Sequence, residues 1–216
     1  ADVLLAIPSA DRELIRRVDR LANEAGLRLL VLPSVHEMFG KLGIGDIRPV
    51  TEADLLGRQP ADIDTGAVAD YITGRRVLVT GAGGSIGSEL CRQIARFAPA
   101  ALLKLDRDES GLHAVQLSIH GRALLDGDDL LLADIRDRDR VMELFRQHRP
   151  DVVFHAAALK HLPLLESAPD EGWKSNVVGT QNVLDPAEAV GVSHFVNIST
   201  DKAANPTSVL GYTKRL

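Results

Sequence analysis

Residues 79–87 read Val79-Thr80-Gly81-Ala82-Gly83-Gly84-Ser85-Ile86-Gly87. The stretch follows an apolar run and opens a helical pattern, so a strand, a glycine turn and a helix are expected in that order. Gly81 lets the chain turn tightly off the strand, Gly84 removes a side chain where the backbone would approach a pyrophosphate, and Gly87 allows close packing of helix on strand. The first helical residues, Ser85 and Ile86, would offer free N–H groups and the positive end of the helix dipole to a phosphate. The stretch therefore predicts a dinucleotide-binding turn.

The spacing of the glycines indicates which type of dinucleotide-binding domain is present. It is Gly-x-x-Gly-x-x-Gly with Gly83 as an extra, because Ile86 stands where the six-residue form needs its last glycine. The seven-residue spacing points to nucleotide-binding domains of the short-chain dehydrogenase type. A glycine-rich turn that binds nothing is the alternative. We favour the cofactor because the strand, the helix and a following acid all fit.

Apolar runs and amphipathic segments alternate through the chain after the turn. Strands are expected at 76–80, 101–105, 130–133, 152–154 and 194–198, and helices at 85–97, 110–120, 138–146 and 176–190. We expect Pro186 to kink the last of these helices or to end it early, because proline removes a backbone hydrogen bond. The alternation predicts an α/β fold, the doubly wound parallel sheet of a Rossmann domain.

The residues before the turn predict a second, smaller unit. Val3–Ile7, Asp11–Ala25 and Leu27–Leu32 form a strand–helix–strand pattern, which is the building block of a parallel sheet. We therefore divide the chain into part of a smaller Rossmann-like βαβ domain at 1–50, a polar connector at 51–74, and an NAD(P)-binding Rossmann domain at 75–216.

Acidic residues stand at the ends of the next two strands. Asp106 ends the second strand of the larger domain, where a carboxylate would accept hydrogen bonds from the adenosine ribose. This favours NAD over NADP, because a carboxylate repels a 2′-phosphate, whereas the neighbouring Arg107 would welcome one. Asp134 and Ile135 end the third strand, where the adenine edge is expected. A solvated turn is an alternative of equal weight for these two residues.

The fourth strand ends in His155-Ala156-Ala157-Ala158. The small side chains of Ala156 and Ala157 would let the cofactor lie against the backbone at the carboxyl ends of the strands. We interpret His155 as structural. His155 and His161 lack the spacing of metal ligands on one helix face, so no metal site is predicted.

A hydroxyl, an acid and an amine follow the fifth strand, at Thr200, Asp201 and Lys202. Substrates bind at this end of the strands, although a Thr-Asp pair is also a common helix cap. Short-chain dehydrogenases need a tyrosine four residues before a lysine, because its phenol moves a proton as hydride leaves. Here Leu210 stands four residues before Lys214. Tyr212 is only two residues from that lysine, which places it on nearly the opposite face of a helix.

Taken together, these segments resemble the membrane-anchored nucleotide-sugar 4,6-dehydratases of bacterial capsule, lipopolysaccharide and glycoprotein pathways, within the extended short-chain dehydrogenase/reductase superfamily. The matching stretches are 54–58, 81–90, 106–109, 155–166 (HAAALKHLPLLE), 176–180 and 199–215 (STDKAANPTSVLGYTKR). The family is similar in having a residue other than tyrosine, often methionine, at the position of Leu210.

The resemblance implies a UDP-N-acetyl-hexosamine substrate, usually UDP-N-acetylglucosamine, and a tightly held NAD. Hydride would leave C4, a proton would leave C5, water would leave from C6, and hydride would return to C6. By position, Asp201 would protonate the leaving hydroxyl, and Lys202 would be the base at C5 if burial and nearby Lys214 keep it uncharged. Thr200 would hold the C4 oxygen and Lys214 the nicotinamide ribose. The base at O4 is unassigned, and Asp201 or an ordered water is suggested.

The resemblance also implies substrate contacts for Lys160, His161 and Asn176, and a homo-oligomer is expected. Family members carry membrane helices before the small domain. We therefore expect a cytoplasmic piece of a protein that is anchored in the inner membrane. Because no start methionine precedes Ala1 and Leu216 stops inside a helical pattern, we expect the 216 residues to bind cofactor without turnover.

Composition weighs against several other classes of function. A net charge of −5 and an aromatic content of 4% disfavour a nucleic-acid partner. The single cysteine, Cys91, cannot form an intramolecular disulfide. No apolar run reaches the ~18 residues of a membrane span, and the first residues do not show the charged and then apolar pattern expected of a signal peptide.

Two other functions stay open. A nucleotide-sugar 4-epimerase or reductase of the same fold is disfavoured by Asp201 and Lys202, because epimerisation at C4 needs no base at C5. The missing tyrosine disfavours it further. A non-catalytic nucleotide-binding scaffold is disfavoured because a decayed site would not be expected to keep an acid and an amine in sequence.

Overall fold

The computed structural model describes residues 2–7, 10, 12–31, 48–50, 65–122 and 127–216. The chain divides into two compact units, Ala1–Asp64 and Thr65–Leu216. The stretch 54–58, part of the resemblance, and residues 42–47 lie outside the described residues.

The first unit is a small three-stranded sheet with one helix. Its elements are β1 (Asp2–Leu5), α1 (Arg12–Glu24), β2 (Arg28–Val31) and β3 (Arg48–Pro49), in the sheet order β1-β2-β3. β1 and β2 are parallel, as the strand–helix–strand pattern predicts, and β3 is antiparallel to β2. Apolar residues at positions 15, 18 and 22 of α1 recur at helical spacing and pack against Leu5, Leu29 and Val31.

The second unit is built on a parallel sheet of five strands. In chain order these are β4 (Arg76–Thr80), β5 (Ala101–Asp106), β6 (Leu130–Leu132), β7 (Val152–His155) and β8 (His194–Asn197), and their order in the sheet is β6-β5-β4-β7-β8. The chain moves outward from β4 to β6 and then crosses to β7, so a topological switch point lies between β4 and β7. Ligands of open α/β sheets bind at the carboxyl ends of the strands at such a point.

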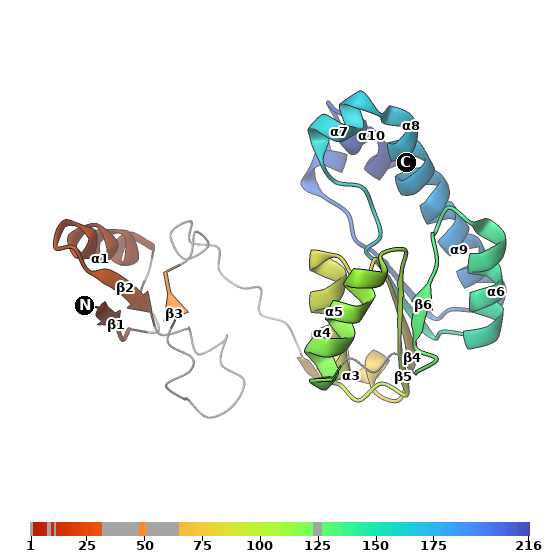
Figure 1. Cartoon of the computed structure of the whole chain (residues 1–216), viewed down its shortest axis with the longest axis horizontal. Helices are drawn as coiled ribbons and strands as arrows, with labels where there is room; N and C mark the ends of the chain where they lie inside the picture. The colour runs from red at the N-terminus through yellow and green to blue at the C-terminus, as the bar shows by residue number, and fades with distance from the viewer. Residues whose placement is uncertain (1, 8–9, 11, 32–47, 51–64, 123–126) are drawn as a thin grey trace. The chain divides into compact units, whose positions relative to one another are not determined.

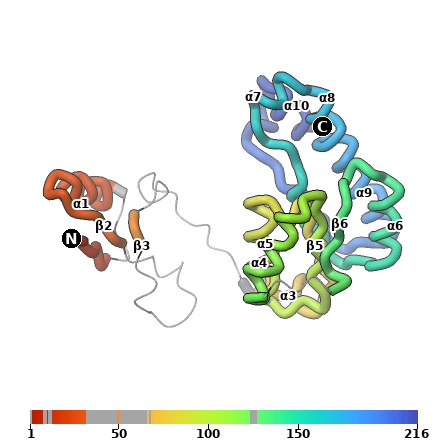
Figure 2. Tube along the Cα trace, in the orientation of Figure 1, coloured from red at the N-terminus to blue at the C-terminus, as the bar shows by residue number. Residues whose placement is uncertain are grey.

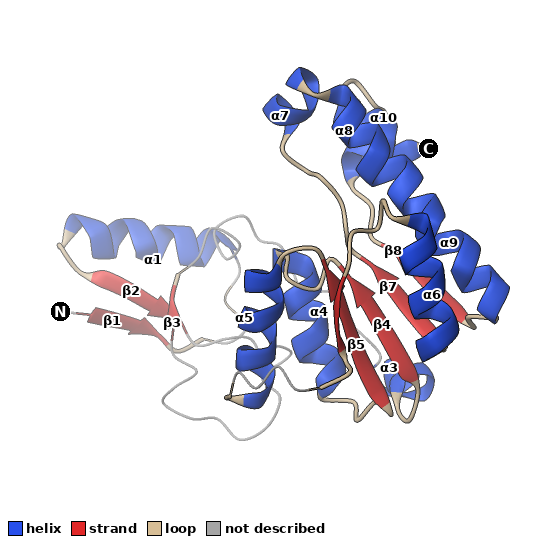
Figure 3. Cartoon of the chain, turned by 45° about the vertical axis from the view of Figure 1, so that its right-hand side comes forward, coloured by secondary structure: helices blue, strands red, loops and turns tan. Residues whose placement is uncertain are grey.

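Helices cover both faces of this sheet (Figure 3). α4 (Ser85–Ala95) and α5 (Glu109–His120) lie on one face, and α6 (Arg138–His148) and α9 (Gly179–Val190) lie on the other. Each face has its own apolar core, one around Val77, Val79 and Ile94 and the other around Leu78, Leu103 and Phe145. Alternate residues of β4 thus enter opposite cores, because successive side chains of a strand point to opposite faces. The doubly wound fold predicted from the sequence is confirmed.

Apart from α9, the helices that follow β7 and β8 gather beyond the carboxyl ends of the strands (Figure 1). They are α7 (Leu162–Ser167), α8 (Pro169–Gly172), the π-helix η3 (Trp173–Val178), the 3-10 helix η4 (Asp201–Ala203) and α10 (Val209–Arg215). Figure 2 shows the chain passing through α7 and α8 and returning through α9, while α10 comes back beside α7 and α8. This group of helices brings residues 159–176 and 200–215 to the same end of the sheet.

Three expectations differ from the structure. The expected connector contains α3 (Thr65–Ile72), whose Ile72 is buried in the core beside Val77, so the second unit begins at residue 65 and not at 75. Of the two effects expected of Pro186, a kink or an early end, the early end is not present, because the helix continues to Val190. Pro186 is buried, and its neighbours Val183 and Ala187 pack in the core, so tertiary packing compensates for the lost hydrogen bond. Finally, the helices between residues 162 and 178 were not expected.

Candidate functional site

The turn after β4 has the geometry that its glycines predict. Gly81 has a φ of +67°, in the left-handed region that favours glycine, and an added Cβ would lie 2.6 Å from the backbone nitrogen of Ala157. At Gly87 an added Cβ would run into the carbonyl oxygen of Gly81 and lie 2.6 Å from its carbonyl carbon. Both glycines are therefore required by the packing of the turn between α4 and β7.

Gly84 has a different role. It is the N-cap of α4, with φ −73° and ψ 169°, a conformation open to any residue. An added Cβ would meet one atom within 4 Å, the carbonyl oxygen of Gly81 at 3.2 Å. The protein itself thus leaves space above the start of α4, where the N–H groups of Ser85 and Ile86 have no acceptor within the helix. This space is what the close approach of a phosphate requires.

Asp106 is fixed at the end of β5 by two backbone groups. Its carboxylate accepts from the N–H of Gly83 at 2.8 Å and from the N–H of Asp108 at 3.0 Å. Gly83 also packs closely on α5, because an added Cβ would lie 2.8 Å from the Cα of Gly111. Gly83, an extra in the glycine spacing, therefore links the turn to the carboxylate expected to bind ribose.

A cavity of about 230 Å³ joins these residues. Its lining comes from the carboxyl ends of four strands: the turn glycines at 81, 83 and 84, residues 105–108, residues 133–135 and residues 156–159, with Ser175 from η3. Cavities for whole ligands measure roughly 300–1,000 Å³, so this one suits part of a dinucleotide. Among the predicted cofactor residues, those at 81, 84, 106, 107, 134, 135, 156 and 157 line it. Ser85, Ile86, Gly87 and Lys214 do not.

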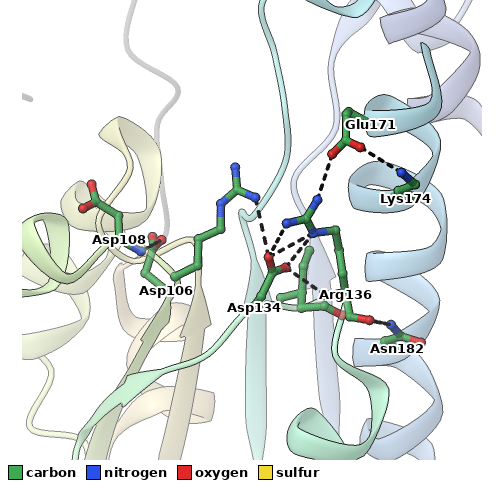
Figure 4. A network of polar contacts seen from close by, with 9 residues as sticks. Asp106, Asp108, Asp134, Arg136, Glu171, Lys174 and Asn182 are labelled. Atoms are coloured by element: carbon green, nitrogen blue, oxygen red, sulfur yellow. Dashed lines mark hydrogen bonds and ion pairs between the residues drawn. The ribbon is translucent and has the colours of Figure 1, made fainter. Parts of the chain in front are cut away.

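A chain of charges runs from this cavity to α8 and η3 (Figure 4). Asp134 accepts from Arg136 at 2.6 Å, Arg136 also donates to Glu171 at 2.8 Å, and Glu171 accepts from Lys174 at 2.9 Å. Burial acts to raise the pKa of Asp134, but the hydrogen bonds and charge of Arg136 outweigh it and lower the pKa. Arg107 lies 3.5 Å from the same carboxylate. The arginine that would welcome a 2′-phosphate is thus paired with an acid in the ligand-free protein.

His155 is buried and bridges three elements. Its Nδ1 lies 2.7 Å from the hydroxyl of Thr80, and its Nε2 lies 3.0 Å from the hydroxyl of Thr180. The Thr180 hydroxyl donates to the carbonyl of Asn176, so it accepts from Nε2–H, and Nδ1 accepts from Thr80. Burial, followed by the charge of Lys214, lowers the pKa of His155 to about 4. We therefore assign His155 a structural role as a neutral imidazole.

This burial predicts that the protein loses stability in mild acid. The unfolded His155 takes a proton near pH 6.5 and the folded one only near pH 4, so the unfolded state binds more protons in between and falling pH favours unfolding. At a pH below both pKa values, protonation of His155 lowers the free energy of unfolding by about 3 kcal/mol. Urea unfolding across this pH range measures it. His155→Gln, which cannot take the proton, should flatten the curve, and an equally steep curve for this variant would contradict the assignment.

Thr200, Asp201 and Lys202 lie together at the carboxyl end of β8. The Thr200 hydroxyl donates to Asp201 at 2.9 Å and caps η4, so the predicted helix cap is present as well. The Lys202 amine lies 3.6 Å from the Asp201 carboxylate. The hydrogen bond from Thr200, followed by the charge of Lys202, lowers the pKa of Asp201. The burial that would favour an uncharged Lys202 is incomplete in the ligand-free protein, because its side chain is 47% exposed.

Lys214 on α10 reaches the same strand end. Its amine donates to the carbonyl of Ile198 at 3.0 Å, and burial lowers the pKa of Lys214. Leu210 is buried, whereas Tyr212 is 57% exposed. The tyrosine is thus turned away from the position that Leu210 occupies, as the helical spacing predicts.

The three predicted substrate contacts lie in different surroundings. Lys160 and His161 are exposed just before α7. Asn176 is buried, and its amide exchanges two hydrogen bonds with the backbone of Leu159 and donates to Thr213 at 3.0 Å. Every polar group of that side chain is used within the protein. In the ligand-free protein Asn176 therefore positions the residues after β7 against α10, and its contact with the substrate stays a prediction.

Sequence reasoning missed Arg136, Glu171, Asn182 and Ser175. Asn182 donates to the carbonyls of Ile135 and Arg136 and so fixes the loop after β6. The spacing of residues in the sequence could not predict these contacts, since the partners are far apart along the chain.

In the described part of the chain, no helix is both long and apolar enough to cross a bilayer.

The parallel sheet, the glycine turn and the carboxylate at the end of β5 define a dinucleotide-binding Rossmann domain. Residues 77–216 match the family described as "Polysaccharide biosynthesis protein". The chain is 41% identical over 218 residues to the probable polysaccharide biosynthesis protein EpsC of Bacillus subtilis, an alignment that covers 99% of the chain and 36% of EpsC. The chain belongs to this family of extended short-chain dehydrogenases/reductases, and it spans about a third of the length of such curated relatives.

Two further relatives are described by their reactions. The UDP-N-acetylglucosamine 4,6-dehydratase (inverting) of Campylobacter jejuni is 33% identical over 142 residues, covering 65% of this chain and 41% of the enzyme. A solved UDP-glucose 4-epimerase of Stenotrophomonas maltophila, with bound NAD and formylated UDP-arabinopyranose, superposes with a TM-score of 0.57. The two sequences are 28% identical, and the superposition covers 65% of this chain and 46% of the epimerase chain.

Proposed function

We propose that this chain is the NAD-binding part of a UDP-N-acetyl-hexosamine 4,6-dehydratase, a carbon–oxygen lyase of bacterial polysaccharide or glycan biosynthesis. The observation that carries the proposal is the adjacency of Asp201 and Lys202 at the end of β8, with the buried Leu210 where a dehydrogenase would have its phenol. Similarity to the Campylobacter dehydratase supports this choice, and UDP-N-acetylglucosamine is the substrate we favour.

The residues of the cavity fit NAD. The space above Gly84 would receive the pyrophosphate, Asp106 the adenosine ribose, and the loop of Asp134 and Ile135 the adenine. When bound, NAD would supply the hydride acceptor for C4 and the hydride donor for C6. Lys214, held at the end of β8 by the Ile198 carbonyl, would bind the nicotinamide ribose.

The protonation states of Asp201 and Lys202 must change before they can act. In the ligand-free protein Asp201 is ionised and pairs with the Lys202 ammonium, whereas the reaction needs a carboxylic acid and a free amine. A sugar that covers the pair removes water, and ions lose more from desolvation than neutral groups do. We propose that one proton then passes from Lys202 to Asp201. Lys202 would take the proton from C5 and return one there when hydride reaches C6. Asp201 would protonate the hydroxyl that leaves C6, and the proton that O4 loses with the C4 hydride would restore this acid, directly or through an ordered water.

The product distinguishes a dehydratase from an epimerase. The whole protein is incubated with UDP-N-acetylglucosamine without added reductant, and the product is read by mass spectrometry. The account predicts a nucleotide sugar that has lost one water. An isomer of unchanged mass would support the epimerase, the reaction of the Stenotrophomonas relative. Bound NAD with no change in the sugar would move the assignment to a different sugar or to a non-catalytic scaffold.

Removing the charge of Asp106 tests the choice of NAD over NADP. Asp106→Asn keeps an oxygen for the N–H of Gly83 but loses the acceptor for the N–H of Asp108 and the charge that strengthens bonds to ribose and repels a 2′-phosphate. We expect NAD⁺ to bind at least about tenfold more weakly, while the difference in affinity between NAD⁺ and NADP⁺ narrows. Titration calorimetry on the chain measures both, with the exposed Asp139→Asn as the matched control. If the difference in affinity between NAD⁺ and NADP⁺ stayed the same, residues other than Asp106 would have to recognise the ribose.

A further inference from the structure

Glu166 joins two segments that are far apart in the sequence. It is an exposed residue of α7, and its carboxylate accepts from the backbone N–H of Val209, the first residue of α10, at 2.8 Å. α7 and α10 lie against each other (Figure 1). The first N–H groups of a helix have no acceptor within the helix, and a negative charge is favourable at this end. Glu166 therefore supplies, from another helix, an acceptor that α10 lacks.

A second contact fixes α10 against the segment expected to carry out the chemistry. An added Cβ at Gly211 would lie 2.6 Å from the carbonyl oxygen of Lys202 and 3.0 Å from the Cβ of Pro206. α10 and the backbone of η4 therefore touch directly, with no side chain between them. Further along the same helix, Lys214 donates to the carbonyl of Ile198. A shift of α10 would therefore displace Lys214 and remove the support behind Lys202.

The other end of the link leads to the residues expected to contact the sugar. Lys160 and His161 are exposed, and His161 is the N-cap of α7. Leu165, the neighbour of Glu166, is buried, so α7 is fixed among the surrounding helices. A displacement of about 1 Å between reacting groups can cost about a hundredfold in rate. The placement of α10 relative to α7 should therefore affect the reaction.

We infer that Glu166 is a positioning residue, whose carboxylate holds α10 against α7 and so places Lys202 and Lys214 relative to the bound sugar. The inference rests on the proposed function. In this role Glu166 needs no contact with the sugar or the cofactor, and it does not line the cofactor cavity. An amide oxygen accepts the same hydrogen bond, so Glu166→Gln should keep the link between the helices, whereas Glu166→Ala loses it.

The experiment compares Glu166→Ala with Glu166→Gln in the whole protein. With UDP-N-acetylglucosamine, Glu166→Ala should lower kcat between about fivefold and a hundredfold, because α10 is no longer held in place. KM should stay within about threefold, since the residues expected to contact the sugar are unchanged. Glu166→Gln should restore kcat to within about twofold of the wild type. Hydrogen exchange, read by mass spectrometry, should be faster at residues 209–216 in Glu166→Ala but not in Glu166→Gln.

Ser208→Ala is the matched control. Ser208 is the N-cap of the same helix, and its hydroxyl accepts from the N–H of Gly211 at 3.2 Å. Glu166→Ala and Ser208→Ala each remove one acceptor from the start of α10, so each should lower the unfolding temperature by about 2–4 °C. Ser208→Ala keeps the link to α7, however, and should leave kcat within about twofold of the wild type.

Three results would overturn the inference. If Glu166→Ala keeps the kcat of the wild type, the carboxylate does not position the reacting groups. If Ser208→Ala loses as much kcat as Glu166→Ala, the stability of α10 matters and its link to α7 does not. If residues 209–216 exchange equally fast in all variants, Glu166 does not hold α10. A wild-type protein that leaves UDP-N-acetylglucosamine unchanged would instead contradict the proposed function, and the exchange rates would still test the link between the helices.

Discussion

Lys202→Met in the whole protein is expected to lower the rate of dehydration of UDP-N-acetylglucosamine by roughly 10²–10⁴-fold, the usual contribution of a general acid or base. Methionine keeps the length of the side chain but cannot take the proton from C5. Because Lys202 does not line the cofactor cavity, the variant should keep its NAD. Turnover is followed by mass spectrometry of the nucleotide sugar, and bound cofactor by its absorbance after denaturation.

The matched control is Lys174→Met. Lys174 is also an exposed lysine paired with an acid, but it lies on η3 and its partner is Glu171, not Asp201. Its replacement should leave the rate of dehydration within about twofold of the wild-type rate, because exposed ion pairs contribute little to stability. Equal rates for Lys202→Met and the wild type would rule out Lys202 as the base, and an equal loss in both variants would point to a general effect of removing charge.

Gly87→Ala is expected to destabilise the second unit by about 3 kcal/mol or more, the upper end of the cost of overpacking. The added methyl would collide with the backbone of Gly81 and Ala82, which lies in the turn itself and cannot move aside. The collision would also displace the turn that is proposed to hold the pyrophosphate, so NAD⁺ binding should weaken as well. Urea unfolding measures the change in the free energy of unfolding.

Gly84→Ala separates stability from binding in the same turn. The new methyl would meet only the carbonyl oxygen of Gly81, at 3.2 Å, so the free energy of unfolding should change by no more than about 1 kcal/mol. The methyl would nevertheless occupy the space proposed for the pyrophosphate, and NAD⁺ binding should weaken at least about tenfold. Tight binding by Gly84→Ala would show that the phosphates lie elsewhere.

The fold was predictable to the extent that it depends on local patterns. The strand before the turn, the glycine spacing and the acid at position 106 are short-range signals, and they predicted β4, α4 and the end of β5 closely. The helices between residues 162 and 178 contain Pro163, Pro169 and a π-helix, and such segments lack the 3.6-residue period on which helix prediction depends.

Only the part of the site that is built from the residues at the strand ends could be predicted from the sequence. Residues that follow strands of a parallel sheet meet at one edge, so the cavity could be assembled from positions 81, 106, 134 and 156. The pairing of Arg136 with Glu171, 35 residues away, and the position of Ser175 in the cavity wall depend on contacts that no spacing encodes. Pro186 shows the same limit, because packing in the core outweighs its local preference.

The central claim is that Lys202 removes the proton at C5 during an internal redox cycle, and incubation in heavy water tests it most directly. The whole protein is given UDP-N-acetylglucosamine without added reductant, and the product is read by mass spectrometry and NMR. The account predicts a sugar that has lost one water and gained one deuterium at C5, and no such product from Lys202→Met. Deuterium in a sugar that has kept its water, or an epimer without deuterium, would contradict it.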